Sequence, residues 1–388
     1  MNTTPSIKQT RVLIVGAGPA GLGVSLALKK AGVTEQIVLD AREVGAAFRS
    51  WTSGMALLTP SFFSNSFGLT DLNSIDPDTS PADFLNTQHP DGPSYANYLE
   101  AIVQHFQLPV ETGVKVTSVT KTSSNFSVET SQGLITTEFI VWAAGQFFHP
   151  RDRDFPGSQH ALHNSAIKDW QELEGDSFTI IGGYESGVDA ALNLINHGKK
   201  VRLISRGEPW ASDHPDPSRS LSPRTLDRLR EILKTPRKAE SLEFVKNTTI
   251  KSIESSSGFW TLRDQDDIPI ATTTRPILAN GFHSGLDLVS DLFDYDENSL
   301  PVFTEEADES SITQGLFYSG PSLVHRNALF CFIYKFRARF GVIAAKIARR
   351  INLPNIEENL QSYAKAGFMN TDLDCCTNCE CAIETNTS

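Results

Sequence analysis

The chain has 388 residues and a formal net charge of −12, with 39% hydrophobic and 21% charged residues. This composition is typical of a folded globular protein, and the length favours two domains or one domain inserted into another. The acidic balance argues against nucleic acid or an anionic membrane as a partner, because both bind basic surfaces. The N-terminal stretch MNTTPSIKQT lacks the apolar segment of a secretion signal, so we expect a cytoplasmic protein with reduced thiols.

A glycine-rich turn follows the first apolar stretch. Val12–Val15 predicts a short buried strand of a parallel sheet. Gly16, Gly18 and Gly21 follow at G-x-G-x-x-G spacing, which allows a tight turn, a close approach of pyrophosphate and close packing of the next helix. Glycines and a proline also interrupt the uncharged stretch 12–28, so we do not expect a membrane span there.

The motif GAGPAGL resembles the FAD-binding site of two-dinucleotide-domain flavoproteins. The next strand, QIVLD, ends in an acidic residue that can accept hydrogen bonds from ribose hydroxyls. The segment VGAAFRSWTSGMALLTPSFF then resembles the part of flavin-containing monooxygenase-like proteins that runs along the flavin, although its tryptophan fits a place in the core equally well. The resemblance implies FAD contacts from Gly16, Gly18, Pro19, Ala20, Gly21, Asp40, Ala41, Arg49, Trp51 and Thr59.

A second turn, in SFTIIGGYESGVDAALNLINHGKKVRLISRGEPW, repeats this plan with one departure. Tyr184 replaces the middle glycine, so a close approach of pyrophosphate to the backbone is in doubt there. The following strand ends in Ser205 and Arg206, and an arginine at this place favours the 2′-phosphate of NADP over the free ribose of NAD. The predicted contacts are Gly182, Gly183, Glu185, Ser186, Gly187, Ser205 and Arg206, and the alternative is a unit of this fold that binds no nucleotide.

The two turns divide the chain and predict an α/β fold with two Rossmann-like, three-layer domains, the NAD(P) domain being inserted into the FAD domain. Two stretches resemble the points where such chains pass the flavin: AAG, with Ala144 and Gly145, and GLFYSG, ending in Gly320. We expect one helix over 327–351, with Cys331 buried in it, and either an irregular loop or a helical excursion over 207–245. The expected boundaries are 1–150 and 276–365 for the FAD domain, 151–275 for the NAD(P) domain and 366–388 for a cysteine-rich tail.

Two dinucleotide sites imply that NAD(P)H gives a hydride to flavin, and the electron acceptor remains open. Phe155, Pro156, Gly157, His163 and Ser165 match a loose form of the monooxygenase fingerprint, which favours oxygen. The stricter spacing is absent, which weakens a Baeyer–Villiger activity, and a structural role for a strand-end histidine competes with a catalytic one. The middle domain also resembles bacillithiol-disulfide reductase-like proteins, which favours a thiol or disulfide substrate.

The tail holds Cys375, Cys376, Cys379 and Cys381, whereas residues 1–330 contain no cysteine. Cys376 and Cys379 have the C-x-x-C spacing that can close a disulfide, and they are the candidate catalytic pair of a redox relay. All four thiols together suit a soft metal ion, and a tail without a direct role is the third alternative. The competing functional class is a non-enzymatic flavoprotein sensor or metal-handling protein that acts through this tail. Similar flavoproteins imply a homodimer.

Overall fold

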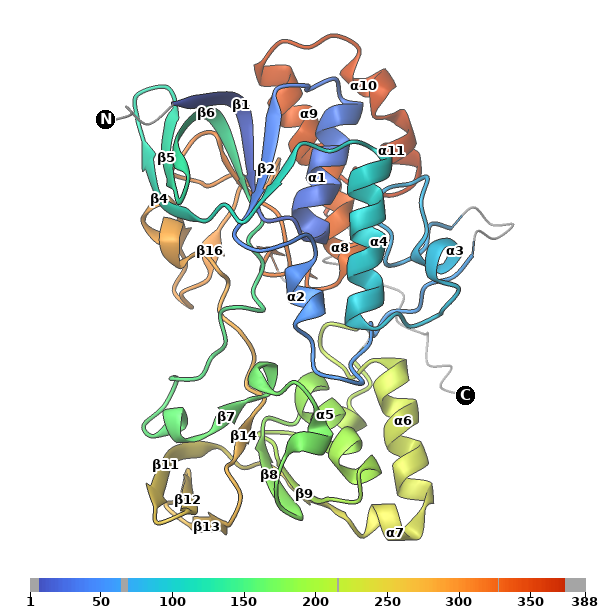
Figure 1. Ribbon diagram of the computed structural model, residues 1–388, viewed down its shortest axis with the longest axis vertical. Coiled ribbons are helices and arrows are strands. Elements are labelled where there is room, and N and C mark those ends of the chain that lie inside the picture. The colour runs from blue at the N-terminus through green and yellow to red at the C-terminus, as the bar shows by residue number, and fades with distance from the viewer. Residues whose placement is uncertain (1–6, 64–68, 215, 327, 374–388) are drawn as a thin grey trace, which may run out of the picture. The chain divides into compact units, whose positions relative to one another are not determined.

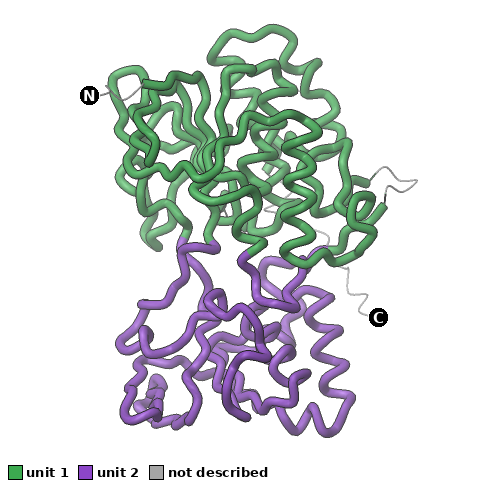
Figure 2. The backbone as a smooth tube through the Cα atoms, viewed as in Figure 1, with its two compact units in different colours: residues 1–49, 60–146, 284–388 green, residues 50–59, 147–283 purple. Residues whose placement is uncertain are grey.

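The computed structural model describes residues 7–63, 69–214, 216–326 and 328–373 (Figure 1). These residues form two compact units, coloured separately in Figure 2. The first unit combines Met1–Arg49, Pro60–Gln146 and Ser284–Ser388, and the second combines Ser50–Thr59 with Phe147–His283. Each unit contains parallel strands flanked by helices, which confirms the predicted α/β class. Within the described ranges no helix is both long enough and apolar enough to cross a membrane.

The first unit is built on a sheet with strand order β3-β2-β1-β6-β5-β4, and β17 also pairs with β6. The long strand β6 has two neighbours on the same side: its first residues pair antiparallel with β5, and Ile140–Trp142 pair parallel with β17. The carboxyl ends of β1, β2, β6 and β17 therefore meet at one edge of the sheet. The strands are β1 (Lys8–Val15), β2 (Gln36–Asp40), β3 (Val110–Thr112), β4 (Val116–Lys121), β5 (Phe126–Thr130), β6 (Gly133–Trp142) and β17 (Leu316–Tyr318).

Helix α1 (Pro19–Lys30) begins directly after the first glycine turn, and all its residues from Ala20 to Leu28 are buried. It lies beside α4 and α9 (Figure 1). A Cβ atom on Gly23 would stand 1.9 Å from the ring of Phe340, so this glycine allows α1 and α9 to pack closely. The other helices of the unit are α2 (Ala46–Arg49), α3 (Pro81–Leu85), α4 (Gly92–His105), α8 (Ile333–Phe336), α9 (Phe340–Arg350), α10 (Ile356–Asn359) and α11 (Gln361–Lys365).

The expectation of one helix over 327–351 is wrong. Ala328–Leu329 is strand β19, which pairs with β18 (Val324–His325), and the helical segment begins only at Ile333. A 3₁₀ turn, Arg337–Arg339, separates α8 from α9. Cys331 precedes the helix and is exposed, so its predicted burial is also wrong.

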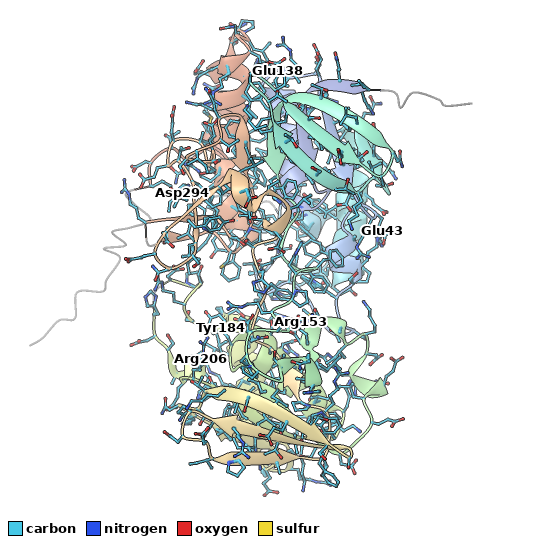
Figure 3. The ribbon with its side chains drawn as sticks, turned by 90° about the vertical axis from the view of Figure 1, so that its left-hand side faces the viewer. Glu43, Glu138, Arg153, Tyr184, Arg206 and Asp294 are labelled. Atoms are coloured by element: carbon cyan, nitrogen blue, oxygen red, sulfur yellow. The ribbon has the colours of Figure 1, made fainter. Side chains whose placement is uncertain are left out.

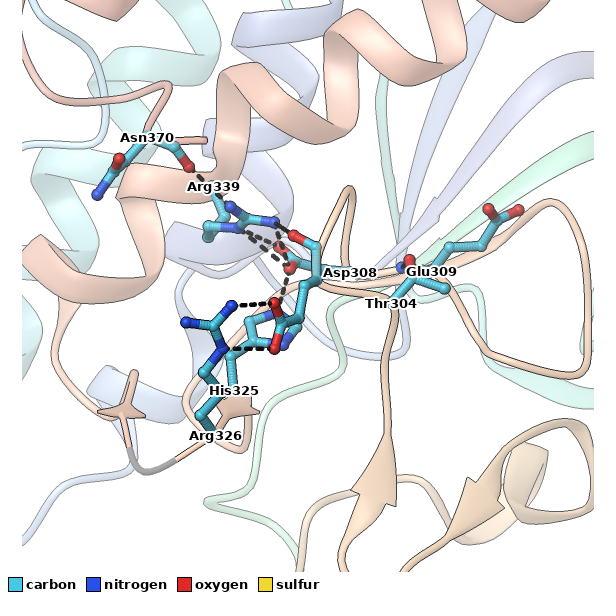
Figure 4. Close-up of polar contacts among 8 residues, drawn as sticks. Thr304, Asp308, Glu309, His325, Arg326, Arg339 and Asn370 are labelled. Carbon is cyan, nitrogen blue, oxygen red and sulfur yellow. Dashed lines mark hydrogen bonds and ion pairs between the residues drawn. The ribbon is translucent and has the colours of Figure 1, made fainter. Parts of the chain in front are cut away.

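Two buried arginines explain this break in the helix. Arg337 donates to the carbonyl oxygens of Asp71 and Ser74, the latter over 2.9 Å. Arg339 is 1% exposed, and its Nε lies 3.0 Å from Oδ2 of Asp308, whose Oδ1 is 2.6 Å from Nε2 of His325 (Figure 4). A periodic apolar pattern does not reveal such charges, because their partners lie far away in the sequence.

The second unit is built on a parallel sheet of order β10-β9-β8-β14-β7, with α5 on one face and an antiparallel layer, β11-β12-β13, on the other. Ile180 belongs to the core beneath α5, and Ile181 belongs to the core beneath the antiparallel layer. The buried part of strand β8 is apolar except for Thr179, because both of its faces are covered. The strands are β7 (Leu162–His163), β8 (Ser177–Ile181), β9 (Lys200–Ile204), β10 (Leu242–Val245), β11 (Ile250–Ser256), β12 (Phe259–Asp264), β13 (Pro269–Thr272) and β14 (Ile277–Leu278).

The second unit's helices are α5 (Glu185–Asn196), α6 (Pro223–Lys234) and α7 (Pro236–Ala239). The segment 207–245, for which an irregular loop and a helical excursion were both left open, contains two helices and strand β10. Ser222 caps α6 by accepting a hydrogen bond from the backbone of Thr225, and Leu229 and Ile232 bury its apolar face in the core beneath α5. The many charged residues around these few apolar positions obscured the helical period in the sequence.

Candidate functional site

The first glycine turn lies at the carboxyl edge of the first unit's sheet, between β1 and α1. Gly16 has φ +115°, and a Cβ there would lie 2.2 Å from the carbonyl oxygen of Ala143. A Cβ on Gly21 would lie 1.9 Å from the carbonyl oxygen of Gly16, whereas a Cβ on Gly18 would meet no atom within 4 Å. The outer glycines are therefore required by packing, and the middle one leaves space in front of the backbone. This arrangement fits the pyrophosphate of a dinucleotide.

The N-terminus of α1 is open to a ligand. Gly18 is its N-cap and provides no side-chain hydrogen bond, and Pro19 has no backbone N–H to satisfy. Helices α4 and α6, in contrast, are capped by the side chains of Asp91 and Ser222. The free amides in the first turn of α1 can thus bind an anion.

Asp40 lies at the end of β2 and stabilises the same turn. Its Oδ2 accepts from the backbone N–H of Ala17 over 2.8 Å, and its Oδ1 accepts from that of Arg42 over 2.8 Å. Ala41, which lies between Asp40 and Arg42 in the sequence, is exposed. Each carboxylate oxygen can accept a second hydrogen bond, so Asp40 can hold the turn and still bind ribose hydroxyls.

Three further residues follow the ends of β6 and β17. Gly145 has φ +71° with no atom within 4 Å of a Cβ position, and Ala144 is half-buried beside it. Gly320 has φ +148°, a backbone conformation that favours glycine. Sequence reasoning missed Ser319, whose Oγ is buried without a hydrogen-bond partner in the described chain. The sequence feature that could have identified Ser319 is its position directly before Gly320.

The remaining predicted flavin contacts lie elsewhere. Arg49 is on α2, and its Nη2 is 2.7 Å from Oε1 of Glu100 and 3.0 Å from Oδ1 of Asn97, both on α4. Trp51 and Thr59 lie in the segment Ser50–Thr59, which belongs to the second unit. Flavin contacts from these three residues stay predictions.

The second glycine turn, between β8 and α5, repeats the backbone geometry of the first. Gly182 has φ +113°, with a Cβ position 2.3 Å from the carbonyl oxygen of Ala279. A Cβ on Gly187 would lie 1.7 Å from the carbonyl oxygen of Gly182. Tyr184 has φ −92° and ψ −163°, close to the −89° and −175° of Gly18. The two turns thus differ at the middle position by a side chain and hardly at all in backbone conformation.

Arg206 follows β9 and is exposed, and no residue of the described chain bonds to its guanidinium group. Figure 3 labels it together with Tyr184 in the second unit. Ser205 is only 5% exposed, and it packs so closely on Gly183 that a Cβ there would lie 2.4 Å from Oγ of Ser205. A free cation beside a buried small residue suits an additional phosphate.

Glu185 has a structural partner. Its Oε2 accepts from the hydroxyl of Thr225 over 2.6 Å, and its Oε1 accepts from the backbone N–H of Ser222. Burial raises the pKa of Glu185, and the hydrogen bonds from Thr225 and Ser222 partly oppose this rise. The side chain therefore connects α5 to the start of α6. Ser186, next to it in the first turn of α5, is half-buried.

His163 ends strand β7 and is 4% exposed. Its Nε2 lies 3.0 Å from the carbonyl oxygen of Gly281, and its Nδ1 lies 2.8 Å from Oγ of Ser165. Burial lowers the pKa of His163, and the hydrogen bond to Gly281 partly opposes this. Both ring nitrogens thus have partners, which supports the structural role expected of a strand-end histidine.

The candidate catalytic and metal-binding cysteines, Cys375, Cys376, Cys379 and Cys381, lie outside the described residues. Within the described ranges no group of three or more His, Cys, Asp or Glu side chains is arranged to hold a metal ion.

The family model described as pyridine nucleotide-disulphide oxidoreductase matches residues 13–320. The chain belongs to this family. It is similar to the bacilliredoxin reductase Bdr of Bacillus subtilis, with 27% identity over 351 residues that cover 89% of this chain and 99% of the relative. The structure resembles that of bacillithiol disulfide reductase from Staphylococcus aureus, with a TM-score of 0.71, 20% identity and coverage of 89% and 99%. It also resembles the flavin-containing monooxygenase from Stenotrophomonas maltophilia, with a TM-score of 0.69, 16% identity and coverage of 89% and 100%.

Family membership determines the enzyme class. The chain is an oxidoreductase that uses FAD and NADP(H), as the two glycine turns predicted, and the alternative of a non-enzymatic sensor is not supported. The predicted resemblance to both disulfide reductase-like and monooxygenase-like flavoproteins is confirmed.

Proposed function

We propose that this oxidoreductase uses NADPH to reduce a low-molecular-weight disulfide, with the overall reaction NADPH + H⁺ + RSSR → NADP⁺ + 2 RSH. The observation that carries this proposal is the similarity to bacilliredoxin reductase, which extends over 99% of that protein. The bound flavin supplies the redox step, taking a hydride from the nicotinamide and passing on two electrons. The proposed substrate class is a bacillithiol-type disulfide, in line with the similarity to bacilliredoxin reductase and to the fold of bacillithiol disulfide reductase.

In this proposal the chain's own residues bind and orient the two cofactors. Gly16, Gly18 and Gly21 bring the pyrophosphate of FAD to the amides of α1, and Asp40 binds its ribose. The small residues Gly145 and Gly320 leave room for the flavin ring. Arg206 binds the 2′-phosphate of NADP(H) beside the second turn.

The route to the disulfide involves the tail, because the first 330 residues contain no cysteine. Cys376 and Cys379, as a disulfide, take two electrons and two protons and become two thiols. One thiolate then attacks the substrate disulfide and releases one thiol, and the other cysteine resolves the mixed disulfide and releases the second. We propose a cytoplasmic location for this reaction, where thiols are kept reduced, and a homodimer.

Oxygen is the second candidate acceptor. The absence of a cysteine pair from residues 1–330 favours it, as does the shared fold with a flavin-containing monooxygenase. In that case the tail has no part in electron transfer and is free to bind a soft metal ion.

The deciding experiment is anaerobic reduction of the purified holoenzyme by NADPH, followed by mixing with different acceptors. We expect NADPH to bleach the flavin absorbance and bacillithiol disulfide to restore it faster than air-saturated buffer, with two thiols released per NADPH. Glutathione disulfide serves as the comparison for substrate selectivity. If the flavin absorbance recovered rapidly with air and not with either disulfide, the result would favour the monooxygenase over the disulfide reductase.

A further inference from the structure

Tyr184 stands where a dinucleotide turn needs open space. Its φ and ψ angles, −92° and −163°, are close to the −89° and −175° of Gly18, and a Cβ on Gly18 would point into a region with no atom within 4 Å. By the same geometry the Cβ of Tyr184 points into the space in front of α5. The phosphates of a bound nucleotide approach the backbone through this space.

The tyrosine ring is held in one direction by the neighbouring segment. Its hydroxyl donates to the carbonyl oxygen of Ser220 over 2.7 Å, and the residue is 38% exposed. Ser220 belongs to residues 216–221, which precede α6. The adjacent Glu185 bonds to Ser222, the residue that follows them. Tyr184, the N-cap of α5, and Glu185, its first residue, therefore hold residues 220 and 222.

We propose that Tyr184 acts as a latch on the nicotinamide-dinucleotide site, and that a nucleotide binds only when the tyrosine ring leaves Ser220 and frees residues 216–221. The hydrogen bond to Ser220 then opposes binding, so Tyr184 sets a lower affinity for NADP(H) than the glycine turn alone would give. This inference rests on the proposed nicotinamide site at the second turn, and it adds a residue that controls access to that site.

The first test measures binding of NADP⁺ to the FAD-loaded full chain by isothermal titration calorimetry. Tyr184→Phe keeps the ring and removes the hydrogen bond, so the Kd falls about fivefold. Tyr184→Gly restores the open middle position and lowers the Kd about tenfold. Tyr295→Phe is the matched control, because Tyr295 has nearly the same exposure, 39%, and lies in the other unit. Its Kd stays at the wild-type value.

The second test follows the segment itself by limited trypsin digestion after the exposed Arg219. Addition of NADP⁺ to the wild-type holoenzyme accelerates this cleavage, and Tyr184→Phe shows the faster cleavage without nucleotide. An unchanged or increased Kd in both Tyr184 variants would overturn the latch while leaving the nicotinamide site intact. If NADP⁺ binds to neither the wild type nor any variant, the nicotinamide site is wrong and the latch falls with it.

Discussion

The three glycines of the first turn have different surroundings. Substitutions at the three positions can therefore distinguish an effect on folding from an effect on cofactor binding. Side chains at Gly16 and Gly21 would collide with backbone atoms, and the turn would have to change. A side chain at Gly18 would meet only the space that the cofactor needs. Tyr184 already occupies the same position in the second turn, in a chain that keeps the same backbone geometry there.

Gly18→Val is expected to give a folded protein without FAD. The new side chain fits at the unstrained φ of −89°, but it blocks the approach of the pyrophosphate. The measurement is the ratio of flavin absorbance to protein after purification, with the thermal unfolding temperatures of the FAD-free wild type and variant as the control. A yellow Gly18→Val protein would show that FAD does not use this turn.

Arg206→Ala is expected to raise the Kd for NADP⁺ about 10- to 100-fold and to leave NAD⁺ within about twofold, because only NADP⁺ carries the 2′-phosphate that a charge-assisted hydrogen bond would hold. Arg202→Ala is the matched control, since Arg202 lies on the adjacent strand β9 and pairs with Glu243 over 2.8 Å. Equal losses for both arginine variants would indicate a general charge effect and not a specific site.

At the level of helices and strands, buried charges determine where elements end. Arg337 and Arg339 interrupt the helix of residues 333–350 because they bond to groups from distant segments. Burial lowers the pKa of Arg337 to about 10, although Asp71 opposes this shift. Glu185 similarly couples α5 to the start of α6. In each case, a substitution that removes the charged group tests whether the contact stabilises the fold.

Asp308→Asn is expected to reduce the free energy of unfolding by about 3 kcal/mol, because it leaves the buried Arg339 without a counter-charge. Asparagine is the suitable replacement, since residue 308 has φ +57° and asparagine tolerates this conformation. The measurement is urea unfolding of the holoenzyme. Glu306→Ala removes the exposed ion pair with Lys346 and is expected to cost less than about 1 kcal/mol.

Glu185→Gln is expected to change how stability depends on pH. Because the folded-state pKa of Glu185 is raised above 4.5, the folded chain binds this proton more tightly, and the residue's contribution to stability falls as pH rises through that range. The glutamine variant lacks this loss, so its stability relative to wild type improves from about pH 4 to about pH 7. The gain is about 1.4 kcal/mol for every tenfold difference in proton affinity between folded and unfolded chain. If the thermal unfolding temperatures of wild type and Glu185→Gln changed in parallel with pH, this prediction would be wrong.

Across the whole chain, the proposed reaction needs two cofactor sites and one disulfide-reactive group. The cofactor turns belong to different compact units, and each unit has its own sheet and core. The cysteine pair belongs to neither glycine turn. The three parts can therefore be inactivated one at a time.

The double variant Cys376→Ser, Cys379→Ser is expected to keep FAD, to bleach with NADPH at the wild-type rate and to lose at least about 100-fold in disulfide turnover, since a thiolate is the nucleophile of the exchange. Cys331→Ser, a change of the cysteine that lies outside the tail, is the control. Full disulfide turnover in the double variant would remove the tail from the reaction. Metal analysis of the wild type and of the variant lacking all four tail cysteines tests the soft-metal alternative separately.

Much of the fold followed from local patterns. The strands before both glycine turns were predicted within a few residues. A strand that is covered on both faces is largely apolar, and the glycine turn that follows marks where it ends. In 207–245 the sequence left an irregular loop and a helical excursion open, because the few apolar residues of α6 are spread among many charges.

The sequence by itself determined the α/β class, the two dinucleotide turns and hence the chemistry of an FAD- and NADP(H)-dependent oxidoreductase. Glycine spacing and strand apolarity carry this information because they act over neighbouring residues. Only the tertiary structure decided that Arg339 is buried against Asp308, that the hydroxyl of Ser319 is buried after the end of β17 and that the hydroxyl of Tyr184 bonds to Ser220. Each of these depends on which distant groups reach the side chain, and no local pattern encodes that.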